Sequence, residues 1–361
     1  MAAAASPRQA SLLPLITLVI SIGLLCAGLW PFSFRAANNV EWIEGSRGLR
    51  FAPYGIAFVQ EPVVGSSSTV DLSKPFSIRL EIRPRDEPRD SIPRILSAYD
   101  NDGQEFFFVG QWKTNLVIWI LTESGPSSGR YRETETAGLR KDASRKYFLR
   151  FTDSGLTILD GGALLETAPE IRPSLIKRHR GTRLVLGNSP SGQDPWTGEI
   201  TSLSILPMAL SPQERVPLGP EPAIRYRFTE GRGTICRNEG SPGHDLVIPT
   251  RFRAPFKGVL APTWKLERWN LEFWEDVVVN VFGFVPFGFV LFAWIRKSRP
   301  TAGFTAGFVA VCLGGIVSLV IELLQVYLPS RDSSLTDVIT NVLGTWLGVM
   351  LCVGFSRVRS R

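Results

Sequence analysis

Four stretches of the chain contain no Asp, Glu, Lys or Arg, and a long polar region separates the first from the other three. These stretches are residues 11–30, 277–295, 300–321 and 338–356. Each has about 19 to 22 residues, so a helix rising 1.5 Å per residue crosses a hydrocarbon layer of roughly 30 Å. The pattern predicts a four-helix transmembrane bundle and excludes a purely soluble protein.

The polar region between the first and second stretch has the pattern of an all-β domain. Short alternating runs recur, for example at residues 76–82, 116–121 and 147–151, and turn-forming residues such as those at 153–155 separate them. Many short strands at this spacing predict a sandwich or barrel. The chain is therefore expected to have several domains, with an all-β domain inserted after the first helix.

The end of the polar region resembles the closing strand of a concanavalin A-like, or laminin-G-like, jelly roll. Residues 195–200 read Pro-Trp-Thr-Gly-Glu-Ile, and residues 210–214 read Leu-Ser-Pro-Gln-Glu. Residues 226–234 resemble the strand that usually opens such domains, and here they supply either a permuted edge strand or a second unit. The resemblance implies a concanavalin A-like sandwich at 36–215, followed at 216–275 by additional strands and a further segment. Aromatic and basic residues alternate within 252–275, which predicts that this segment lies at the membrane surface.

The resemblance to this fold raises the question of sugar binding. Trp112, Trp119 and Trp196 are candidates for stacking on a glycan, but packing in the core is the favoured role for each. Asp100 and Asp102 are candidate calcium ligands, although a hairpin turn uses the same residue types. The carboxylate spacing of glucanases with this fold is absent from the sequence. We expect a binding or spacing module, with calcium as the one candidate cofactor.

An eight-residue pattern occurs twice, where the second and the fourth apolar stretch begin. Residues 276–283 and 337–344 both read Asp-Val-x-x-Asn-Val-x-Gly. This spacing places Asp, Asn and Gly on one face of a helix. Glycine permits close approach between membrane helices, and Gly344 and Gly348 continue such a face. The repeat predicts two helices that present the same kind of surface.

Polar residues of three helices are expected at the same depth, just beneath the outer membrane surface. The candidates for a binding pocket are Asp276, Asn280, Glu322, Gln325, Arg331, Asp332, Asp337 and Asn341. A buried carboxylate is costly in lipid unless it is paired or protonated, so this convergence indicates a shared site. The site either stabilises helix contacts, or binds or processes a lipid-linked envelope substrate, or serves transport. Glu322 is the candidate catalytic acid or base, and Arg331 suits an anionic headgroup.

Residues 276–356 resemble the VanZ-like membrane family, and the segment 1–35 supplies the family's first span. The matching residues are Asn280, Gly283, Phe284, Pro286, Gly288, Glu322, Gln325, Leu328, Pro329, Arg331, Asp332, Asp337, Asn341 and Gly344. The family's name-giver is linked to teicoplanin resistance, so the resemblance implies an envelope or antibiotic-resistance role. The activity of most members is undefined. The alternatives are an enzyme or transporter for a lipid-linked precursor and a purely structural or interaction protein.

The net charge of +7 is explained by the ends of the apolar stretches. Seven basic residues lie there: Arg8, Arg296, Lys297, Arg299, Arg357, Arg359 and Arg361. Subtracting them from 40 Lys and Arg leaves 33, which equals the 33 acidic residues. This distribution follows the positive-inside rule and removes the support for nucleic-acid binding. It predicts a bacterial-type plasma membrane protein with both termini, including the tail 357–361, in the cytoplasm.

Only Cys236 of the four cysteines lies outside the apolar stretches. The β-domain is therefore expected to lack an internal disulfide. Because the positive-inside rule places this domain outside the cell, we expect Cys236 to react with a membrane-impermeant maleimide.

Overall fold

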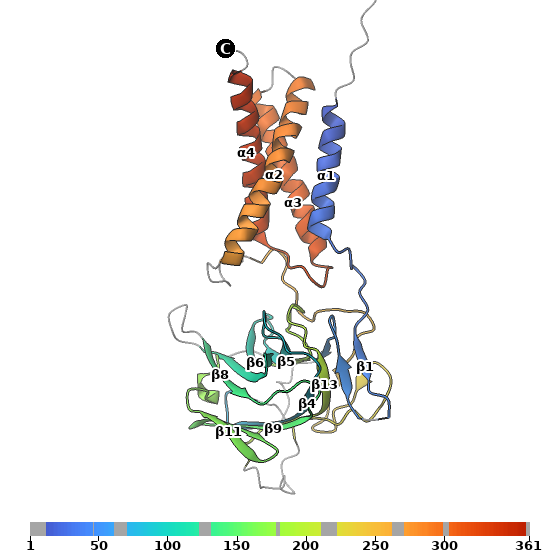
Figure 1. Cartoon of the computed structure of the whole chain (residues 1–361), viewed down its shortest axis with the longest axis vertical. Coiled ribbons are helices and arrows are strands. Elements are labelled where there is room, and N and C mark those ends of the chain that lie inside the picture. The colour runs from blue at the N-terminus through green and yellow to red at the C-terminus, as the bar shows by residue number, and fades with distance from the viewer. Residues whose placement is uncertain are drawn as a thin grey trace, which may run out of the picture. The chain divides into compact units, whose positions relative to one another are not determined.

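The computed structural model describes residues 12–45, 47–60, 71–122, 131–177, 181–210, 222–261, 271–298 and 303–358. The chain divides into two compact units, which Figure 1 shows. The helical unit contains Met1–Phe34 and Gly258–Arg361, and the β unit contains Arg35–Lys257.

The β unit is a sandwich of two antiparallel eight-stranded sheets, so the predicted all-β sandwich is confirmed. The first sheet has the order β1-β2-β13-β4-β9-β10-β11, and β14 pairs with β13. Its strands are β1 (Val40–Trp42), β2 (Leu49–Phe51), β4 (Phe76–Pro84), β9 (Arg145–Thr152), β10 (Gly155–Asp160), β11 (Ala163–Ala168), β13 (Gly198–Leu206) and β14 (Ile224–Tyr226).

The second sheet has the order β15-β16-β3-β12-β5-β6-β7-β8. Its strands are β3 (Ala57–Val59), β5 (Arg94–Tyr99), β6 (Glu105–Trp112), β7 (Asn115–Leu121), β8 (Tyr131–Ala137), β12 (Arg183–Leu186), β15 (Ile235–Cys236) and β16 (Leu246–Val247). A short 3₁₀ helix, Pro173–Leu175, lies between β11 and β12.

The core lies between the two sheets and is filled by the inward side of each alternating strand. In β4, for example, Ile78, Leu80 and Ile82 are at most 1% exposed, while the residues between them are partly exposed. Alternate residues of a strand point to opposite faces, so this periodicity fixes which side chains reach the core. Phe76 stacks on Phe151 at 4.2 Å between ring centroids, and such aromatic pairs fill the centre.

The strands after residue 222 complete the same sandwich. β14 pairs with Leu203–Ile205 of β13, and β16 pairs with β3 in the other sheet. Of the two alternatives left by the sequence, these residues therefore act as edge strands. Cys236 in β15 is 0% exposed, and burial together with the nearby Glu230 raises the pKa of its thiol. The expected reaction of Cys236 with an impermeant maleimide is thus wrong for the folded protein.

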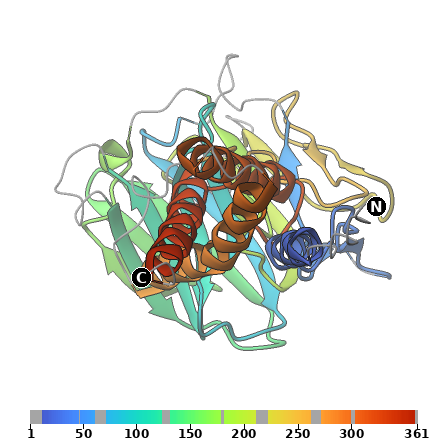
Figure 2. The same ribbon diagram turned by 90° about the horizontal axis from the view of Figure 1, so that it is seen from above.

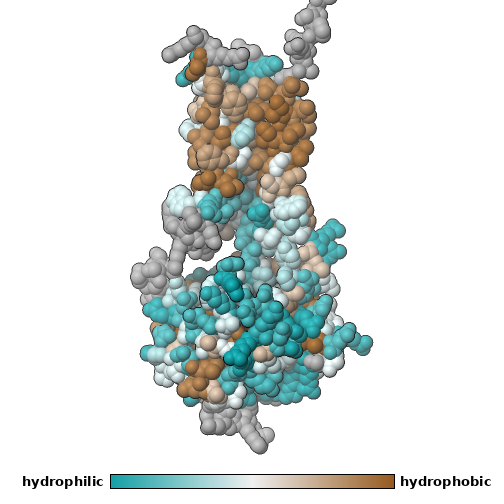
Figure 3. All heavy atoms as spheres, in the orientation of Figure 1, coloured by the Kyte–Doolittle hydropathy of each residue, from teal (hydrophilic) through white to brown (hydrophobic). Residues whose placement is uncertain are grey.

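The helical unit consists of α1 (Leu13–Leu29), α2 (Leu271–Ser298), α3 (Gly303–Gln325) and α4 (Leu335–Val358). The last three contain spans that are long and apolar enough to cross a membrane. Helix α1 is apolar but has 17 described residues, about 25 Å at 1.5 Å per residue, so its crossing stays a prediction. Figure 3 shows hydrophobic residues along the helices, where Val279, Phe282 and Phe308 are each more than half exposed. Such a surface suits lipid.

Helices α2 and α4 lie side by side, as Figure 2 shows from one end of the bundle, and they pack through glycine. A Cβ added to Gly288, Gly344 or Gly348 would lie 2.1 to 2.2 Å from a backbone oxygen of the other helix. These positions therefore require glycine for the helices to approach so closely. Gly283, the counterpart of Gly344 in the repeat, has nothing within 4 Å of an added Cβ. The glycine of the repeat therefore makes a close contact between helices in α4 but not in α2.

Candidate functional site

Glu322 caps the beginning of α4 from the neighbouring helix α3. It is 2% exposed, and its Oε2 accepts a hydrogen bond from the backbone N–H of Ser334 at 2.7 Å. Ser334 directly precedes α4, and its Oγ accepts the N–H of Asp337 at 3.3 Å. The first N–H groups of a helix have no partner within it, so both bonds satisfy groups that would otherwise be unpaired.

Asp337 connects this cap to α2. Its carboxylate accepts hydrogen bonds from the side chains of Ser334 and Asn280. Asp276 and Arg331 lie close enough to interact electrostatically with it, and Arg331 also interacts with Glu322. The structure therefore brings residues of α2, α3, α4 and the loop before α4 into one polar cluster. We define the polar cluster as Asp276, Asn280, Glu322, Arg331 and Asp337.

Asn341 lies one turn further into the bundle and is 4% exposed. Its Nδ2 donates to Ser318 Oγ at 2.9 Å, and its Oδ1 is buried with no hydrogen-bond partner. Thr345, another turn along α4, donates its hydroxyl to the carbonyl of Asn341 at 2.9 Å. Polar side chains thus continue inward from the polar cluster between α3 and α4.

Two of the predicted pocket residues have other surroundings. Gln325 is buried, and its Nε2 donates to the carbonyl of Gly28 in α1 at 2.9 Å, so it contributes to the contact between α1 and α3. Asp332 is exposed in the loop between α3 and α4. Arg331 in the same loop donates from Nε to the carbonyl of Trp30 at 3.4 Å.

The sequence interpretation overlooked the serines that hold this loop. Ser333 Oγ accepts the N–H of Leu260 at 3.0 Å, and Ala261 forms an isolated parallel bridge with Ser334. The signal for Ser334 is present in the sequence, because Ser-x-x-Asp before an apolar run is a helix-capping pattern. No comparable signal identifies the contact with Leu260.

A row of flat side chains crosses the outward face of the second sheet. Phe108 stacks on Trp119 with ring centroids 5.2 Å apart, and Trp119 stacks on Tyr131 at 5.9 Å. The guanidinium of Arg94 lies 3.7 Å from the centroid of the Phe108 ring. We call these four residues the aromatic row. They come from β5, β6, β7 and β8 in turn, so the row follows the order of the sheet.

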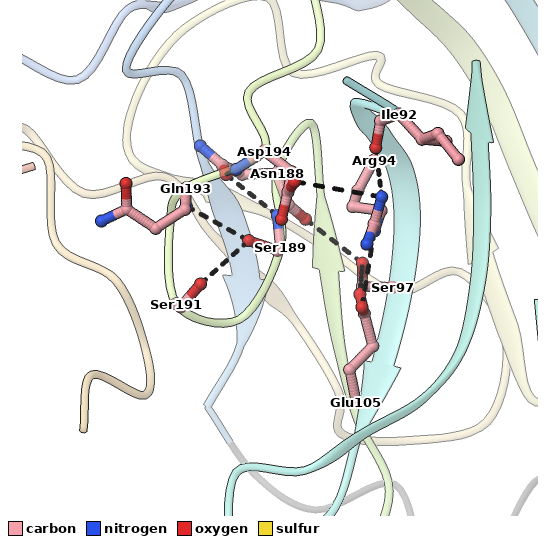
Figure 4. A network of polar contacts seen from close by, with 9 residues as sticks. All are labelled: Ile92, Arg94, Ser97, Glu105, Asn188, Ser189, Ser191, Gln193 and Asp194. Carbon is pink, nitrogen blue, oxygen red and sulfur yellow. Dashed lines mark hydrogen bonds and ion pairs between the residues drawn. The ribbon is translucent and has the colours of Figure 1, made fainter. Parts of the chain in front are cut away.

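A buried polar network holds Arg94 in this position, as Figure 4 shows. Its Nε lies 3.4 Å from Glu105 Oε2, and its Nη1 donates to the carbonyl of Ile92. Ser97 Oγ donates to Glu105 Oε1 at 2.6 Å. Burial raises the pKa of Glu105, although Arg94 and Ser97 oppose this shift. The guanidinium of Arg94 is therefore held in place by the carboxylate of Glu105 on β6 and by the backbone carbonyl of Ile92.

Loop residues between β12 and β13 complete the network. Asn188 is 0% exposed, and its Oδ1 accepts the N–H groups of Ser189 and Asp194 at 2.9 and 3.0 Å. The backbone N–H of Arg94 donates to the carbonyl of Asp194 at 3.0 Å. These bonds fix the loop against the start of β5, beside the aromatic row.

An open hollow of about 480 Å³ lies on the same face of the sheet. It is lined by Ile92, Trp112, Val117, Glu133, Thr134 and Glu135. The ammonium of Lys113 lies 5.2 Å from the centroid of the Trp112 ring. The hollow thus combines two aliphatic side chains, one large aromatic side chain and two carboxylates.

The three tryptophans proposed for glycan stacking differ in position. Trp112 lines the hollow, and Trp119 is half-buried in the aromatic row. Trp196 is 1% exposed, and its Nε1 donates to Gln111 Oε1 at 2.8 Å inside the sandwich. Trp196 therefore presents no ring face to a ligand, and its role is packing in the core.

The candidate calcium residues form a hairpin turn between β5 and β6. Asp100 Oδ1 accepts the backbone N–H groups of Asp102 and Gln104 at 3.0 and 2.8 Å. Within the described ranges, no group of three or more His, Cys, Asp or Glu side chains is placed to hold a metal ion. Calcium binding at Asp100 and Asp102 stays a prediction from the sequence.

Several solved structures are similar to part of this chain, whereas no curated protein matches it. The binding domain of botulinum neurotoxin DC in complex with SialylT has 14% identity and a TM-score of 0.39, covering 48% of this chain and 43% of that chain. The Ruminococcus gnavus IT-sialidase CBM40 bound to alpha2,3 sialyllactose has 15% identity and a TM-score of 0.34, covering 48% and 92%. The Trypanosoma rangeli sialidase in complex with the inhibitor DANA has 13% identity and a TM-score of 0.36, covering 49% and 27%.

These likenesses are too distant to support a functional argument. This chain spans less than half of the length of the first of these structures.

The family comparison concerns the other unit. The family model VanZ/LLP1 matches residues 234–356, which contain α2, α3 and most of α4 together with β15 and β16. The matched range includes every residue of the polar cluster. It also includes the glycines through which α2 and α4 pack. The helical C-terminal part of this chain is therefore similar to the VanZ/LLP1 family of proteins.

Proposed function

We propose that this protein is a multi-pass envelope protein whose β-sandwich binds glycan on the outward face of the second sheet. The observation that carries the proposal is the hollow that contains Trp112, which lies beside the aromatic row. Within the row, Phe108 and Tyr131 already cover the two faces of Trp119. Flat aromatic faces pack against the apolar faces of sugar rings, and carboxylates at the edge accept hydrogen bonds from hydroxyl groups. The polar network around Arg94 holds this surface in a fixed geometry, which reduces the entropy lost on binding.

The test uses the full chain in lipid nanodiscs and an array of envelope polysaccharides and oligosaccharides. Trp112→Ala should reduce retention of the bound glycan at least tenfold, while circular dichroism confirms the fold. Leu164→Ala is the control, because Leu164 is 63% exposed on β11 of the other sheet. If the wild-type chain retains no glycan, the sandwich is a spacer or protein-interaction module instead.

The proposed orientation places the β unit outside the cell and both termini in the cytoplasm. Helices α2 and α4 both begin at the polar cluster and end at basic residues, Arg296 and Lys297 in α2 and Arg357 in α4. The basic residues therefore share one end of the bundle, and the positive-inside rule favours the cytoplasm for that end. The polar cluster then lies near the outer surface of the membrane.

A second function is favoured by the polar cluster itself. Three carboxylates and Arg331 lie together, and the buried Oδ1 of Asn341 has no hydrogen-bond partner. Such a group of charges suits the headgroup of a lipid-linked envelope precursor, with Arg331 on its phosphate and Glu322 as acid or base. The alternative is that the polar cluster only stabilises helix contacts, which the cap between Glu322 and Ser334 supports.

Glycopeptide resistance is the most specific form of this envelope role. A strain that lacks the protein should become more susceptible to teicoplanin, and the wild-type chain should restore resistance. Complementation by Glu322→Gln then separates the two interpretations of the polar cluster. Full complementation by this variant indicates a structural cluster, whereas loss of resistance with normal accumulation in the membrane indicates that the carboxylate acts on a substrate.

A further inference from the structure

The hollow on the second sheet has a rigid apolar base. Its floor is Val117 of β7, which is 4% exposed, and one wall is Ile92. The wall is fixed because the N–H of Gln111 donates to the carbonyl of Pro93 at 3.0 Å. The strand below leaves room only for glycine, since a Cβ at Gly110 would lie 2.9 Å from the Ile92 side chain. The shape of the hollow is therefore determined by the fold.

The opposite side of the hollow is acidic. Glu133 and Glu135 are exposed on β8, two residues apart, so their side chains leave the same face roughly 7 Å from each other. Asn115 Nδ2 donates to Glu135 Oε2 at 3.1 Å and orients that carboxylate. Among the described residues, neither glutamate takes part in an ion pair, and no Lys or Arg lines the hollow.

Trp112 already contacts a cation in the folded protein. The Lys113 ammonium lies over its ring, which shows that the ring is accessible to a positive charge. A ligand that carries a positive charge can gain the same interaction and can also pair with Glu133 and Glu135. An anionic ligand would be repelled by both carboxylates at this site.

We propose that the hollow binds an amino sugar with a free, protonated amine, as in a deacetylated hexosamine unit of an envelope glycan. The ring of the sugar packs on Trp112 and Val117, and its ammonium group donates hydrogen bonds to Glu133 and Glu135. A sugar fits better than a lysine side chain, because the apolar floor and the aromatic wall offer flat surfaces to a ring. This inference rests on the proposed glycan-binding function and specifies the ligand class.

The experiment measures binding of four probes to the full chain in nanodiscs by isothermal titration calorimetry. The probes are a glucosamine oligosaccharide, its N-acetylated counterpart, an anionic sialylated oligosaccharide and a trilysine peptide. We expect the glucosamine probe to bind at least tenfold more tightly than each of the others. The double substitution Glu133→Gln and Glu135→Gln should remove most of this preference, and Lys113→Met should strengthen binding of the glucosamine probe, because a competing cation is lost. Glu166→Gln on β11 is the matched control for removal of a charge from an exposed strand.

The outcomes separate this inference from the function on which it rests. Equal binding of the N-acetylated probe, or unchanged preference in the double variant, overturns the role of the amine while glycan binding stands. Tightest binding of the sialylated probe overturns it in the same way. Equal binding of trilysine shows a general cation site and overturns the sugar assignment. If no oligosaccharide binds, the proposed function fails together with the inference.

Discussion

The carboxylate of Glu322 on α3 accepts the backbone N–H of Ser334, the residue that precedes α4, at 2.7 Å. Two helices that are adjacent in the sequence are thus joined where the second begins. A buried N–H without a partner costs about 1–3 kcal/mol, so the bond stabilises the loop and the first turn of α4 together. The same carboxylate lies near Arg331 and Asp337. Glu322 therefore caps α4 and is also part of the polar cluster.

Substitution of Glu322 separates these roles through stability. Glu322→Gln keeps an acceptor oxygen for the N–H of Ser334, so we expect thermal stability in detergent close to that of the wild type. Glu322→Ala leaves the N–H buried without a partner and should destabilise the helical unit by about 1–3 kcal/mol. Equal stability of the Ala variant and the wild type would show that the cap contributes nothing.

The glycine contacts between α2 and α4 give a second prediction. Gly344→Ala and Gly348→Ala place a Cβ within 2.2 Å of a backbone oxygen, so the helices must separate. Such overpacking costs about 1–3 kcal/mol, measured as a lower midpoint of thermal unfolding in nanodiscs. Gly283→Ala is the matched control from the same repeat, because nothing lies within 4 Å of its added Cβ. A comparable loss in all three variants would contradict the packing explanation, because Gly283→Ala introduces no clash and Ala has the higher helix propensity.

The features that follow from local periodicity were predictable from the sequence. The buried positions Leu116, Ile118 and Ile120 of β7 alternate with the outward-facing Trp119, so the position of this tryptophan follows from strand parity. Trp196 precedes β13, where no alternation fixes its direction, and the sequence therefore left stacking and packing open. Cys236 belongs to a strand of two residues, which is too short for any pattern to show burial.

The polar cluster was predictable for a similar reason. Depth along a helix follows from residue number, so the convergence of Asp276, Glu322 and Asp337 at one end of the bundle could be calculated. The partner of Gln325 could not, because Gly28 of α1 lies almost 300 residues away and the two meet only through tertiary packing. The bond between Glu322 and Ser334 depends on the conformation of the loop before α4, and the pattern of apolar residues does not predict that conformation.

The two ion pairs of Glu199, with Arg50 and Arg85, predict a dependence of β-unit stability on pH. Burial raises the pKa of Glu199, but the hydrogen bonds from Arg85 at 2.7 Å and Arg50 at 3.1 Å outweigh it and lower the pKa below the ordinary 4.5. A carboxyl whose pKa is lower in the folded state stabilises the fold above its unfolded pKa. This contribution is lost as the pH falls through the lower, folded value.

Glu199→Gln should therefore destabilise the sandwich by about 2 kcal/mol at neutral pH. The difference from the wild type should disappear in strongly acidic solution, where the wild-type carboxyl is also protonated. Hydrogen exchange at amides of β2, β4 and β13, which pair around this residue, measures the effect in the full chain. The control is Glu81→Gln, whose partner Lys146 is largely exposed, and its cost should stay within about 1 kcal/mol. A difference for Glu199→Gln that does not change with pH would show that charge is not involved.

The orientation of the chain in the membrane gives the last prediction, tested with cysteines placed where the structure makes them accessible. Asp153 lies exposed in the turn between β9 and β10, and Ser298 lies exposed at the basic end of α2. In intact cells with the outer barrier opened, an impermeant maleimide should label Asp153→Cys and should label Ser298→Cys only after lysis, because the basic end is retained in the cytoplasm. The buried Cys236 should react only in denaturant, which provides an internal check that the β unit is folded. The reverse pattern, with Ser298→Cys labelled in intact cells and Asp153→Cys protected, would place the sandwich in the cytoplasm and remove its access to envelope glycan.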